Sequence, residues 1–284
     1  MPDDFDHFEP YLKKSFHRLP MLENAGIRKF FSGPESFTPD TQYLLGETPE
    51  IKNFFTCCGF NSIGIASSGG AGRVTAEWMI NGHINEDLFS VDIKRFQQFH
   101  SSKKFIMERV TETLGDLYGM HWPYKQHKTS RNQITLPYHE ELKKLGACFG
   151  SSGGFERPMW YSLNGAKAEY EYSFGYQNWY PSAEYETKNT RKNVGLFELT
   201  PFSKFDVAGE NVHDELQKLC TANIKDVEGR STYTQMLNED GGIETDVTIT
   251  CLTKNHFRII GPAATREHDK SVSYTHLTLP TRCL

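Results

Sequence analysis

The feature that most constrains the fold is a strand-like run, a glycine-rich stretch and a helical pattern that follow one another within residues 54–82. Residues 54–58 are typical of a strand, residues 59–72 are rich in glycine, and the helical spacing that follows stops at Asn81-Gly82. Such a loop brings bare backbone N–H groups and a positive helix N-terminus against an electron-rich ligand atom. Taken alone, however, this pattern is more often a plain connection between a strand and a helix.

The residues before this unit predict a helix and the start of a sheet. Apolar positions spaced by three or four run from Phe5 to Leu22 and indicate a helix over residues 5–25. Residues 27–31 form a short β-like run, and residues 43–45 indicate a further strand between turn residues.

The middle of the chain predicts a connecting module with two helices. Residues 96–118 show a polar-faced helical pattern, and residues 140–145 indicate a short helix. Residues 160–180 hold a dense aromatic run, and the alternation at residues 170–174 predicts a strand. Large aromatic side chains mostly serve cores and domain contacts, so we interpret this run as packing rather than as a platform for a ligand.

After Leu196 the sequence is typical of an α+β domain. It predicts a helix over residues 211–220 and strands at residues 202–207, 232–237, 245–252 and 257–260. Residues 238–242 tolerate positive φ angles and predict a hairpin between the second and third of these strands. Residues 271–284 break the pattern and resemble a translated cloning adapter, so we expect Leu277, Leu279 and the rest of this tail to pack against nothing.

Length and charge limit the class of protein. With 284 residues the chain exceeds the usual size of one domain, so two units are expected. The net charge of -5 and the absence of a basic stripe argue against a nucleic-acid partner. No stretch approaches the roughly 20 apolar residues that cross a bilayer. We therefore expect a soluble protein without a membrane span.

The cysteines and histidines predict neither disulfides nor a metal. The six cysteines lack the short spacings of a disulfide-stapled secreted domain, which argues for free thiols in a reducing compartment. Five of them are expected to be inert core thiols, namely Cys57, Cys58, Cys148, Cys220 and Cys251. Metal-ligand spacing and accompanying acids or thiols are lacking at His121, His127 and His139, so we expect no metal site.

An ordered set of motifs resembles one family. The C-terminal end of the FAD-binding domain of sarcosine and dimethylglycine dehydrogenases is similar to residues 33–40, 46–47, 59–64, 69–72 and 76–78. The entry to that family's second half resembles residues 154–158 and 178–180. The aminomethyltransferase (T-protein) of the glycine cleavage system resembles residues 195–205, 233–238, 241–246 and 264–267. The likeness covers nearly all of residues 3–270.

The resemblance implies an α/β plus α+β chain in three native parts. Residues 1–95 would be the C-terminal part of a DAO-type FAD-binding oxidoreductase domain, and residues 96–155 a central connecting module. Residues 156–270 would be the N-terminal part of an aminomethyltransferase-like, folate-binding domain, and residues 271–284 the adapter-derived tail.

The same resemblance implies FAD and tetrahydrofolate as cofactors. In this family the flavin takes a hydride equivalent from an N-methyl amine such as sarcosine or dimethylglycine, and the one-carbon unit passes to tetrahydrofolate. Contacts with FAD are carried over onto Gly59, Phe60, Asn61, Ser62, Ile63, Gly64 and Ile65. A loop of this kind can lie along the flavin ring, with the helix dipole favouring negative charge on the reduced flavin.

Contacts with folate are carried over onto Tyr233 and Asp246, where a carboxylate could hydrogen-bond to folate nitrogens or steer protons there. Family members often show two adjacent acids here, whereas this chain has Thr245 before Asp246, so Asp246 alone is carried over. Hairpin packing for Tyr233 and a solvent-facing polar position for Asp246 stay open as alternatives. No catalytic residue is assigned.

By resemblance, the parent protein would lie in the mitochondrial matrix, or otherwise in the cytoplasm, and an electron-transfer flavoprotein would be its partner. A strand with a Gly-x-Gly-x-x-Gly turn for the FAD pyrophosphate does not occur before residue 59. We therefore expect an inactive internal fragment in which residues 1–95 form an incomplete α/β piece with an exposed sheet edge or apolar face.

Two other functions stay open. The regulatory subunit of pyruvate dehydrogenase phosphatase resembles the same two-domain layout and shares the motif of residues 33–40, which would make this a non-catalytic relative. A stand-alone aminomethyltransferase is disfavoured, because residues 3–90 have no place in one.

Overall fold

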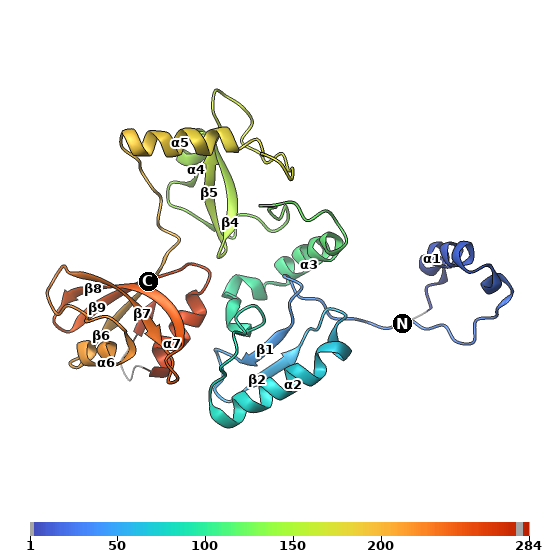
Figure 1. Ribbon diagram of the computed structural model, residues 1–284, viewed down its shortest axis with the longest axis horizontal. Helices are drawn as coiled ribbons and strands as arrows, with labels where there is room; N and C mark the ends of the chain where they lie inside the picture. The colour runs from blue at the N-terminus through green and yellow to red at the C-terminus, as the bar shows by residue number, and fades with distance from the viewer. Residues whose placement is uncertain (1–2, 277–280, 284) are drawn as a thin grey trace.

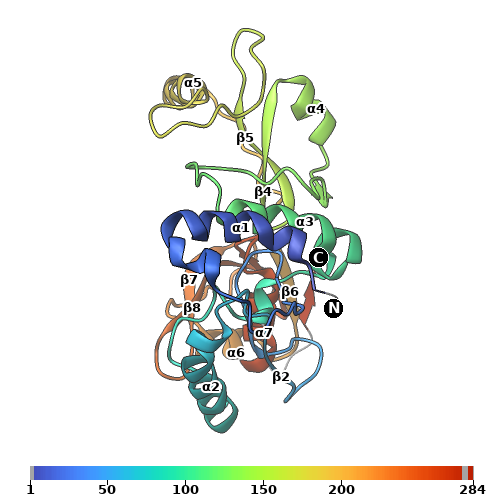
Figure 2. The ribbon, with the colours of Figure 1, turned by 90° about the vertical axis from the view of Figure 1, so that its right-hand side faces the viewer.

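The computed structural model describes the backbone of residues 3–276 and 281–283 and the side chains of residues 3–272. Figure 1 shows an N-terminal helix set apart at one end, a small unit around β1 (Leu44–Glu47), β2 (Phe55–Cys58) and α2 (Gly64–Asn81), and the C-terminal sheet, which has five strands. A third unit holds β4 (Ala147–Ser152), β5 (Phe155–Tyr161) and α5 (Tyr180–Lys192) (Figure 2). The tip of its β4–β5 hairpin meets the C-terminal domain, where a β-carbon at Gly153 would lie 2.8 Å from the Ala263 carbonyl carbon.

The predicted N-terminal helix is confirmed, with a break near its end. Helix α1 spans Phe5–Arg18 and is capped by Asp4, whose carboxylate accepts a hydrogen bond from the His7 amide, and the short helix η1 follows at Pro20–Asn24. The predicted strand at residues 27–31 is wrong. Phe30 packs its ring against two aromatic residues of α1, and no strand lies beside it among the described residues.

Strands β1 (Leu44–Glu47) and β2 (Phe55–Cys58) pair antiparallel, and helix α2 (Gly64–Asn81) packs its apolar side against them. Gly46, with φ of 105°, leaves room for the Trp78 ring, because a β-carbon there would lie 2.6 Å from the Trp78 Cζ3 atom. Gly82 ends α2 in the left-handed conformation at φ of 79°, as the pattern predicted.

The glycine-rich stretch is mostly helix rather than loop, which corrects the sequence interpretation. Residues 64–72 form the first half of α2, so the connection from β2 shortens to residues 59–63. Glycine lowers helix propensity, but burial of Ala71 and Val74 against the sheet supplies the tertiary packing that overrides it.

The expected open sheet edge is confirmed in this unit. Its sheet has two strands, and β1 gains on its other side one isolated parallel bridge, from Leu45 to Asp92. Large apolar side chains on α2 stand in solvent, with Ile65 97% and Ile80 82% exposed.

The central region consists of short elements around a three-stranded sheet in the order β3-β5-β4. The elements are η2 (Ile93–Arg95), η3 (Gln98–Ser101), α3 (Lys103–Leu117), β3 (Ile134–Thr135), α4 (His139–Lys144), β4 (Ala147–Ser152), β5 (Phe155–Tyr161) and α5 (Tyr180–Lys192). The two predicted helices correspond to α3 and α4. The β4–β5 hairpin and α5 were not predicted.

The packing interpretation of the aromatic run holds for part of it, since Phe174 and Tyr176 are 68% and 83% exposed. The strand predicted at residues 170–174 is wrong. Tyr170 stacks on Tyr172 at 5.6 Å between ring centroids, and its edge meets the buried Trp160. The Glu171 amide donates to the Asn178 side chain at 3.0 Å, which takes this backbone out of any sheet ladder.

The C-terminal domain follows the predicted α+β order. Its elements are β6 (Ser203–Ala208), α6 (Val212–Leu219), β7 (Ser231–Leu237), β8 (Ile243–Thr253), β9 (His256–Gly261), α7 (Arg266–His276) and β10 (Thr281–Cys283). They form a sheet in the order β10-β6-β9-β8-β7, with β7 and β8 joined by the predicted hairpin. One face of the sheet and α6 enclose a core that includes Phe205, Leu216 and Phe257.

The expectation that the tail packs against nothing is wrong in two places. Val272 is buried on α7, since the amphipathic helix opened near Arg266 continues past residue 270. The backbone of β10 pairs antiparallel with β6, which covers the free edge of that strand. Leu277 and Leu279 lie outside the described residues, and the adapter origin of the tail stays a prediction.

The cysteine expectation holds for three thiols and fails for two. Cys148, Cys220 and Cys251 are buried, and burial raises the pKa of both Cys148 and Cys220 to about 11. Cys57 and Cys58 are exposed, because β2 lies at the edge of a two-stranded sheet.

His268 on α7 links the C-terminal domain to the N-terminal unit. Its Nε2 lies 3.3 Å from Glu244, its Nδ1 lies 3.3 Å from Asp269, and its ring meets Phe89 edge-on. Burial opposes a charge on the ring, but the hydrogen bonds to Asp269 and Glu244 outweigh it and raise the pKa of His268 to about 9.

This raised pKa predicts a loss of stability in alkali. The folded pKa of His268 lies above the unfolded value of about 6.5. The stability that protonated His268 contributes is therefore complete below about pH 6.5 and disappears as pH rises through about 9. We expect His268→Gln to cost on the order of 1–2 kcal/mol near pH 6 and little at pH 10, after allowance for partial screening. Denaturant unfolding of both proteins across this range measures it, and a pH-independent difference would contradict the assignment.

Candidate functional site

Residues 59–63 make a tight turn between β2 and α2. Gly59, Asn61 and Ser62 adopt left-handed backbone angles, with φ of 68°, 49° and 70°. Glycine and asparagine tolerate this region better than other residues, which explains their place here.

Asn61 anchors the turn from inside. It is 7% exposed, its Oδ1 accepts the Thr38 amide at 2.8 Å, and its Nδ2 donates to the Gly59 carbonyl at 2.6 Å and to Thr38 Oγ1 at 3.1 Å. The Asn61 amide donates to the Ser36 carbonyl at 3.3 Å. The motif of residues 33–40 and the turn, 23 residues apart, are therefore one hydrogen-bonded unit.

Close packing fixes both ends of the turn. A β-carbon at Gly59 would lie 3.0 Å from Thr38 Cγ2, and one at Gly64 would lie 3.3 Å from Phe60 Cβ. The Phe60 ring stacks on Tyr43 with centroids 4.9 Å apart. The turn is held by its own neighbours and leaves little freedom to the backbone.

The N-terminus of α2 is open on the outer side of this turn. Ile63 is the N-cap and makes no side-chain cap bond, and the first helical bond runs from the Ser67 amide to the Ile63 carbonyl at 2.9 Å. The amides of the preceding helical residues point out of the helix end, beside the exposed Ser62, Ile63 and Ile65. This end can stabilise negative charge on a ligand.

The seven residues expected to contact the flavin thus divide by position. Ser62, Ile63 and Ile65 are exposed, and Gly64 is half-buried at the start of α2. Gly59, Phe60 and Asn61 face their own unit, so they shape the turn rather than present side chains to a ligand.

Tyr233 and Asp246 lie together on the outer face of the C-terminal sheet. They are diagonal neighbours in the β7–β8 ladder, and the Tyr233 hydroxyl donates to Asp246 Oδ2 at 2.8 Å. That hydrogen bond raises the pKa of Tyr233 above its ordinary value. Both side chains are exposed, so this pair can meet a ligand that lies across the sheet.

Thr245 points the other way. It is 8% exposed on the buried face, because successive residues of a strand alternate between faces. The position before Asp246 therefore cannot join the outer pair.

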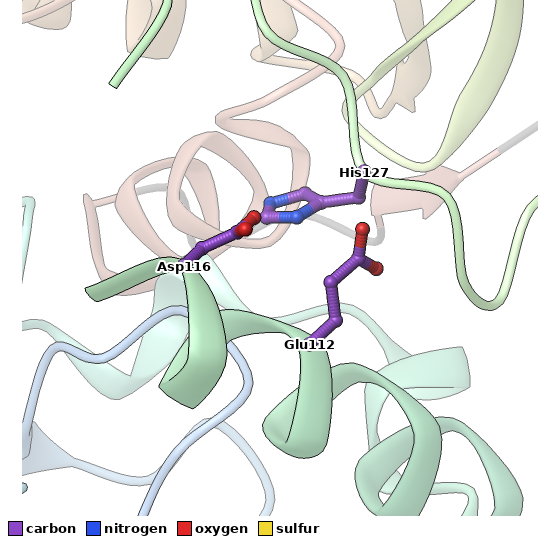
Figure 3. Close-up of side chains that lie close together, drawn as sticks. All are labelled: Glu112, Asp116 and His127. Carbon is purple, nitrogen blue, oxygen red and sulfur yellow. The ribbon is translucent and has the colours of Figure 1, made fainter. Parts of the chain in front are cut away.

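The structure also brings together a group that the sequence interpretation missed. Glu112 and Asp116, one turn apart on α3, lie next to His127 in the following loop, so His127 does have accompanying acids (Figure 3). Burial and the nearby Arg109 lower the pKa of His127. Two acids four residues apart on a predicted helix were a signal in the sequence. The sequence gives no signal that the following loop returns to this helix and brings His127 beside them.

Three family models match the chain in sequence order. A model of the FAD dependent oxidoreductase matches residues 1–78, one of the FAD dependent oxidoreductase central domain matches residues 81–135, and one of the GCVT N-terminal domain matches residues 138–281. These matches follow the order of parts that the motifs indicated.

Curated relatives match over nearly the whole chain. It is 41% identical over 95% of its length to 4-methylaminobutanoate oxidase (formaldehyde-forming) of Paenarthrobacter nicotinovorans, covering 33% of that protein. It is 34% identical over 94% of its length to the mitochondrial pyruvate dehydrogenase phosphatase regulatory subunit of Mus musculus, covering 31%. It is 32% identical over 89% of its length to mitochondrial sarcosine dehydrogenase of Homo sapiens, covering 30%.

The chain therefore spans about a third of the length of the curated relatives it matches. Within the described residues, the helices are all too short or too polar to cross a bilayer.

Proposed function

The chain belongs to the sarcosine and dimethylglycine dehydrogenase family, and on this basis we propose that its parent protein oxidises an N-methyl amine with FAD. The substrate would be a small secondary or tertiary amine such as sarcosine or dimethylglycine. The observation that carries the proposal is the anchored turn at residues 59–63, which opens the N-terminus of α2 outward in a segment that matches the oxidoreductase model.

The residues of the turn fit a flavin by position and by polarity. Bound FAD supplies the electron acceptor for the N-methyl group. The open amides of α2 would lie against the electron-rich edge of the ring and favour negative charge there. Asn61 would act as a positioning residue, because its amide group bonds Thr38 and Gly59 and so sets the backbone of Ser62 and Ile63.

Flavin loading tests this assignment. In the parent protein, we expect Gly64→Trp to lower FAD occupancy strongly, because the indole would occupy the space beside the helix end. Gly69→Trp on the same helix is the matched control, since a β-carbon there meets nothing within 4 Å. Visible flavin absorbance per protein after desalting measures both, with circular dichroism to confirm folding.

The isolated 284-residue chain should be colourless in the same assay. FAD affinity in this fold class comes largely from a glycine turn at the pyrophosphate, and the residues before Gly59 contain no such turn. Stoichiometric yellow colour in this chain, or full loading of the Gly64→Trp parent, would show that the turn at residues 59–63 has been misassigned.

For the second half of the reaction we propose that the GCVT-like domain binds tetrahydrofolate at Tyr233 and Asp246 and receives the one-carbon unit. What supports this is that both side chains are exposed, adjacent and hydrogen-bonded to each other. A carboxylate in this place can accept a hydrogen bond from a folate nitrogen or move a proton there.

Removing either polar group should weaken folate binding. We expect Tyr233→Phe and Asp246→Asn each to weaken tetrahydrofolate binding in the parent protein about tenfold, the effect of one charge-assisted hydrogen bond. Ser231→Ala is the control, because its hydroxyl bonds Thr250 on the same face of the ladder. Titration by tryptophan fluorescence measures the three. A loss of stability with unchanged affinity would favour the packing role for Tyr233.

Location and electron acceptor are proposed from relatives. The mammalian relatives are mitochondrial by name, so we propose the mitochondrial matrix for the parent protein and an electron-transfer flavoprotein as its partner. The most identical of the three relatives described is named an oxidase. Stopped-flow reoxidation of the reduced parent with oxygen and with an electron-transfer flavoprotein distinguishes these acceptors.

A non-catalytic function is the second candidate, favoured by the 34% identity to the phosphatase regulatory subunit. Anaerobic addition of sarcosine, dimethylglycine or 4-methylaminobutanoate to the flavin-loaded parent decides between the two. Bleaching of the flavin by one of these amines supports the enzyme, and a flavin that stays oxidised with all of them supports the regulatory protein.

A further inference from the structure

We propose that Glu112, Asp116 and His127 form a binding site for one divalent first-row metal ion of the zinc class, which fastens the loop of residues 118–133 to α3. The site lies in the central region, shares no residue with the turn at residues 59–63 or with the Tyr233–Asp246 pair, and does not depend on the proposed oxidation. Its role would be structural, as a cross-link between a helix and an otherwise irregular segment.

The three ligand atoms already converge. One atom from each side chain lies within 4.8 Å of the other two, so a single point lies within about 2.8 Å of all three. Small rotations of the side chains would bring them to the roughly 2.0–2.2 Å of zinc bonds to nitrogen and oxygen. Figure 3 shows both carboxylates rising from α3 and the His127 ring entering from the loop above them.

Sequence and backbone explain this convergence. Residues 112 and 116 are one helical turn apart, which places both carboxylates on the same face of α3. Glu112 draws the loop back to this face, because its two oxygens accept the backbone amides of Lys128 and Thr129 at 2.6 and 2.9 Å. The adjacent residue His127 is thereby held over the helix.

An independent observation points to a ligand at the imidazole. His127 Nδ1 is buried and has no hydrogen-bond partner among the described residues. Buried polar atoms are nearly always satisfied, so a buried ring nitrogen without a partner calls for a bound ion or water. Imidazole nitrogen with carboxylate oxygen is a donor set suited to zinc and its neighbours in the first row.

Two cations compete with a metal ion, namely Arg109, whose Nε lies 3.9 Å from Glu112 Oε2, and Lys125. Lys125 Nζ donates to Asp116 Oδ1 at 2.6 Å, so it already neutralises one of the two carboxylates. A metal ion must share Asp116 with this ammonium group or displace it. Removing the lysine charge should therefore strengthen metal binding, so Lys125→Met is expected to bind the ion more tightly than the unmutated chain.

Equilibrium dialysis of the metal-free full chain against Zn²⁺, with metal analysis, tests the site. We expect one bound ion per chain, and at least about tenfold weaker binding in His127→Gln and Asp116→Asn, since loss of even an outer-shell partner costs ~10–100-fold. Lys125→Met should bind roughly fivefold more tightly or better, from the Coulomb repulsion removed.

Two controls exclude other zinc ligands. His121→Gln removes a neighbouring histidine that lies against the Asp116 backbone carbonyl rather than in the cluster. This variant should bind Zn²⁺ with the affinity of the unmutated 284-residue chain. Replacing the exposed Cys57 and Cys58 by serine should also leave binding unchanged. The proposal is wrong if the cysteine variant loses the ion, or if His127→Gln binds it with the affinity of the unmutated 284-residue chain.

A measurement on the unmutated chain guards against variants that fold poorly. Co²⁺ bound at this site should show visible d–d absorption without the near-ultraviolet charge-transfer band of a cobalt–thiolate bond. A thiolate band, or failure to bind either ion stoichiometrically, would overturn the proposal.

Discussion

Replacing Asn61 by alanine is expected to open the turn before α2 and to destabilise the N-terminal unit by about 2–4 kcal/mol, because several buried polar groups lose their partners. The Thr38 amide and the Gly59 carbonyl both bond the Asn61 side chain, and neither can turn to water without moving the backbone. Hydrogen exchange of residues 44–58 measures the effect where it arises, since a chain of several units does not unfold in a single two-state step.

The matched control is Asn53→Ala. Asn53 shares the left-handed backbone of Asn61, with φ of 62°, but it is exposed and its backbone amide is the atom that bonds Glu47. Its replacement should cost only the backbone strain, about 1–2 kcal/mol. Equal costs at the two positions would mean that the buried hydrogen bonds of Asn61 contribute nothing. In the parent protein, Asn61→Ala should also lower FAD occupancy if the turn borders the flavin.

Local patterns predicted several elements whose stabilising contacts are local, although they missed the β4–β5 hairpin and α5. The hairpin of β7 and β8 follows from the turn residues at 238–242, and once its register is set Tyr233 and Asp246 must be neighbours on one face. The sequence is therefore enough to predict that these two residues are neighbours, although their assignment to folate came from the family resemblance.

Contacts between distant segments were not predictable in this way. Asn61 meets Thr38 across 23 residues, and Arg131 meets Glu156 across 25, through irregular backbone with no periodic signal. The first half of α2 was missed for a related reason. Its glycines disfavour a helix, and only packing of Ala71 and Val74 on the sheet reverses that preference.

The largest loss of stability is expected from Glu156→Ala, about 3–5 kcal/mol, since it breaks a buried ion pair and leaves a guanidinium without its partner. Glu156 is 2% exposed. Its Oε1 accepts Arg131 Nε at 2.6 Å and the Asn132 amide at 2.9 Å, and its Oε2 accepts Arg131 Nη2. One carboxylate thus joins β5 to the loop that precedes β3.

Glu169→Ala is the matched control for this prediction. Glu169 pairs with Lys167 at 2.6 Å in the same region, but both side chains are more than half exposed. Exposed ion pairs contribute about 0–1 kcal/mol, so the free energy of unfolding of this variant should be close to that of the unmutated chain. Replacing Arg131 and Glu156 together by methionine should cost less than Glu156→Ala alone, because no unpaired charge is left behind.

Acid should reproduce the effect of removing Glu156. Burial alone would raise the pKa of Glu156, but the hydrogen bonds from Arg131 and Asn132 outweigh it and hold the pKa below its ordinary value. A depressed folded pKa contributes stability that is complete above the unfolded carboxyl pKa of about 4.3 and is lost as pH falls through the folded value. The protection factors of the β4 and β5 amides, from which the pH dependence of intrinsic exchange is divided out, should therefore fall between pH 6 and pH 3 by more in the unmutated chain than in the Arg131→Met, Glu156→Met chain. An equal fall of the protection factors in both chains would remove Glu156 as the origin of the acid sensitivity.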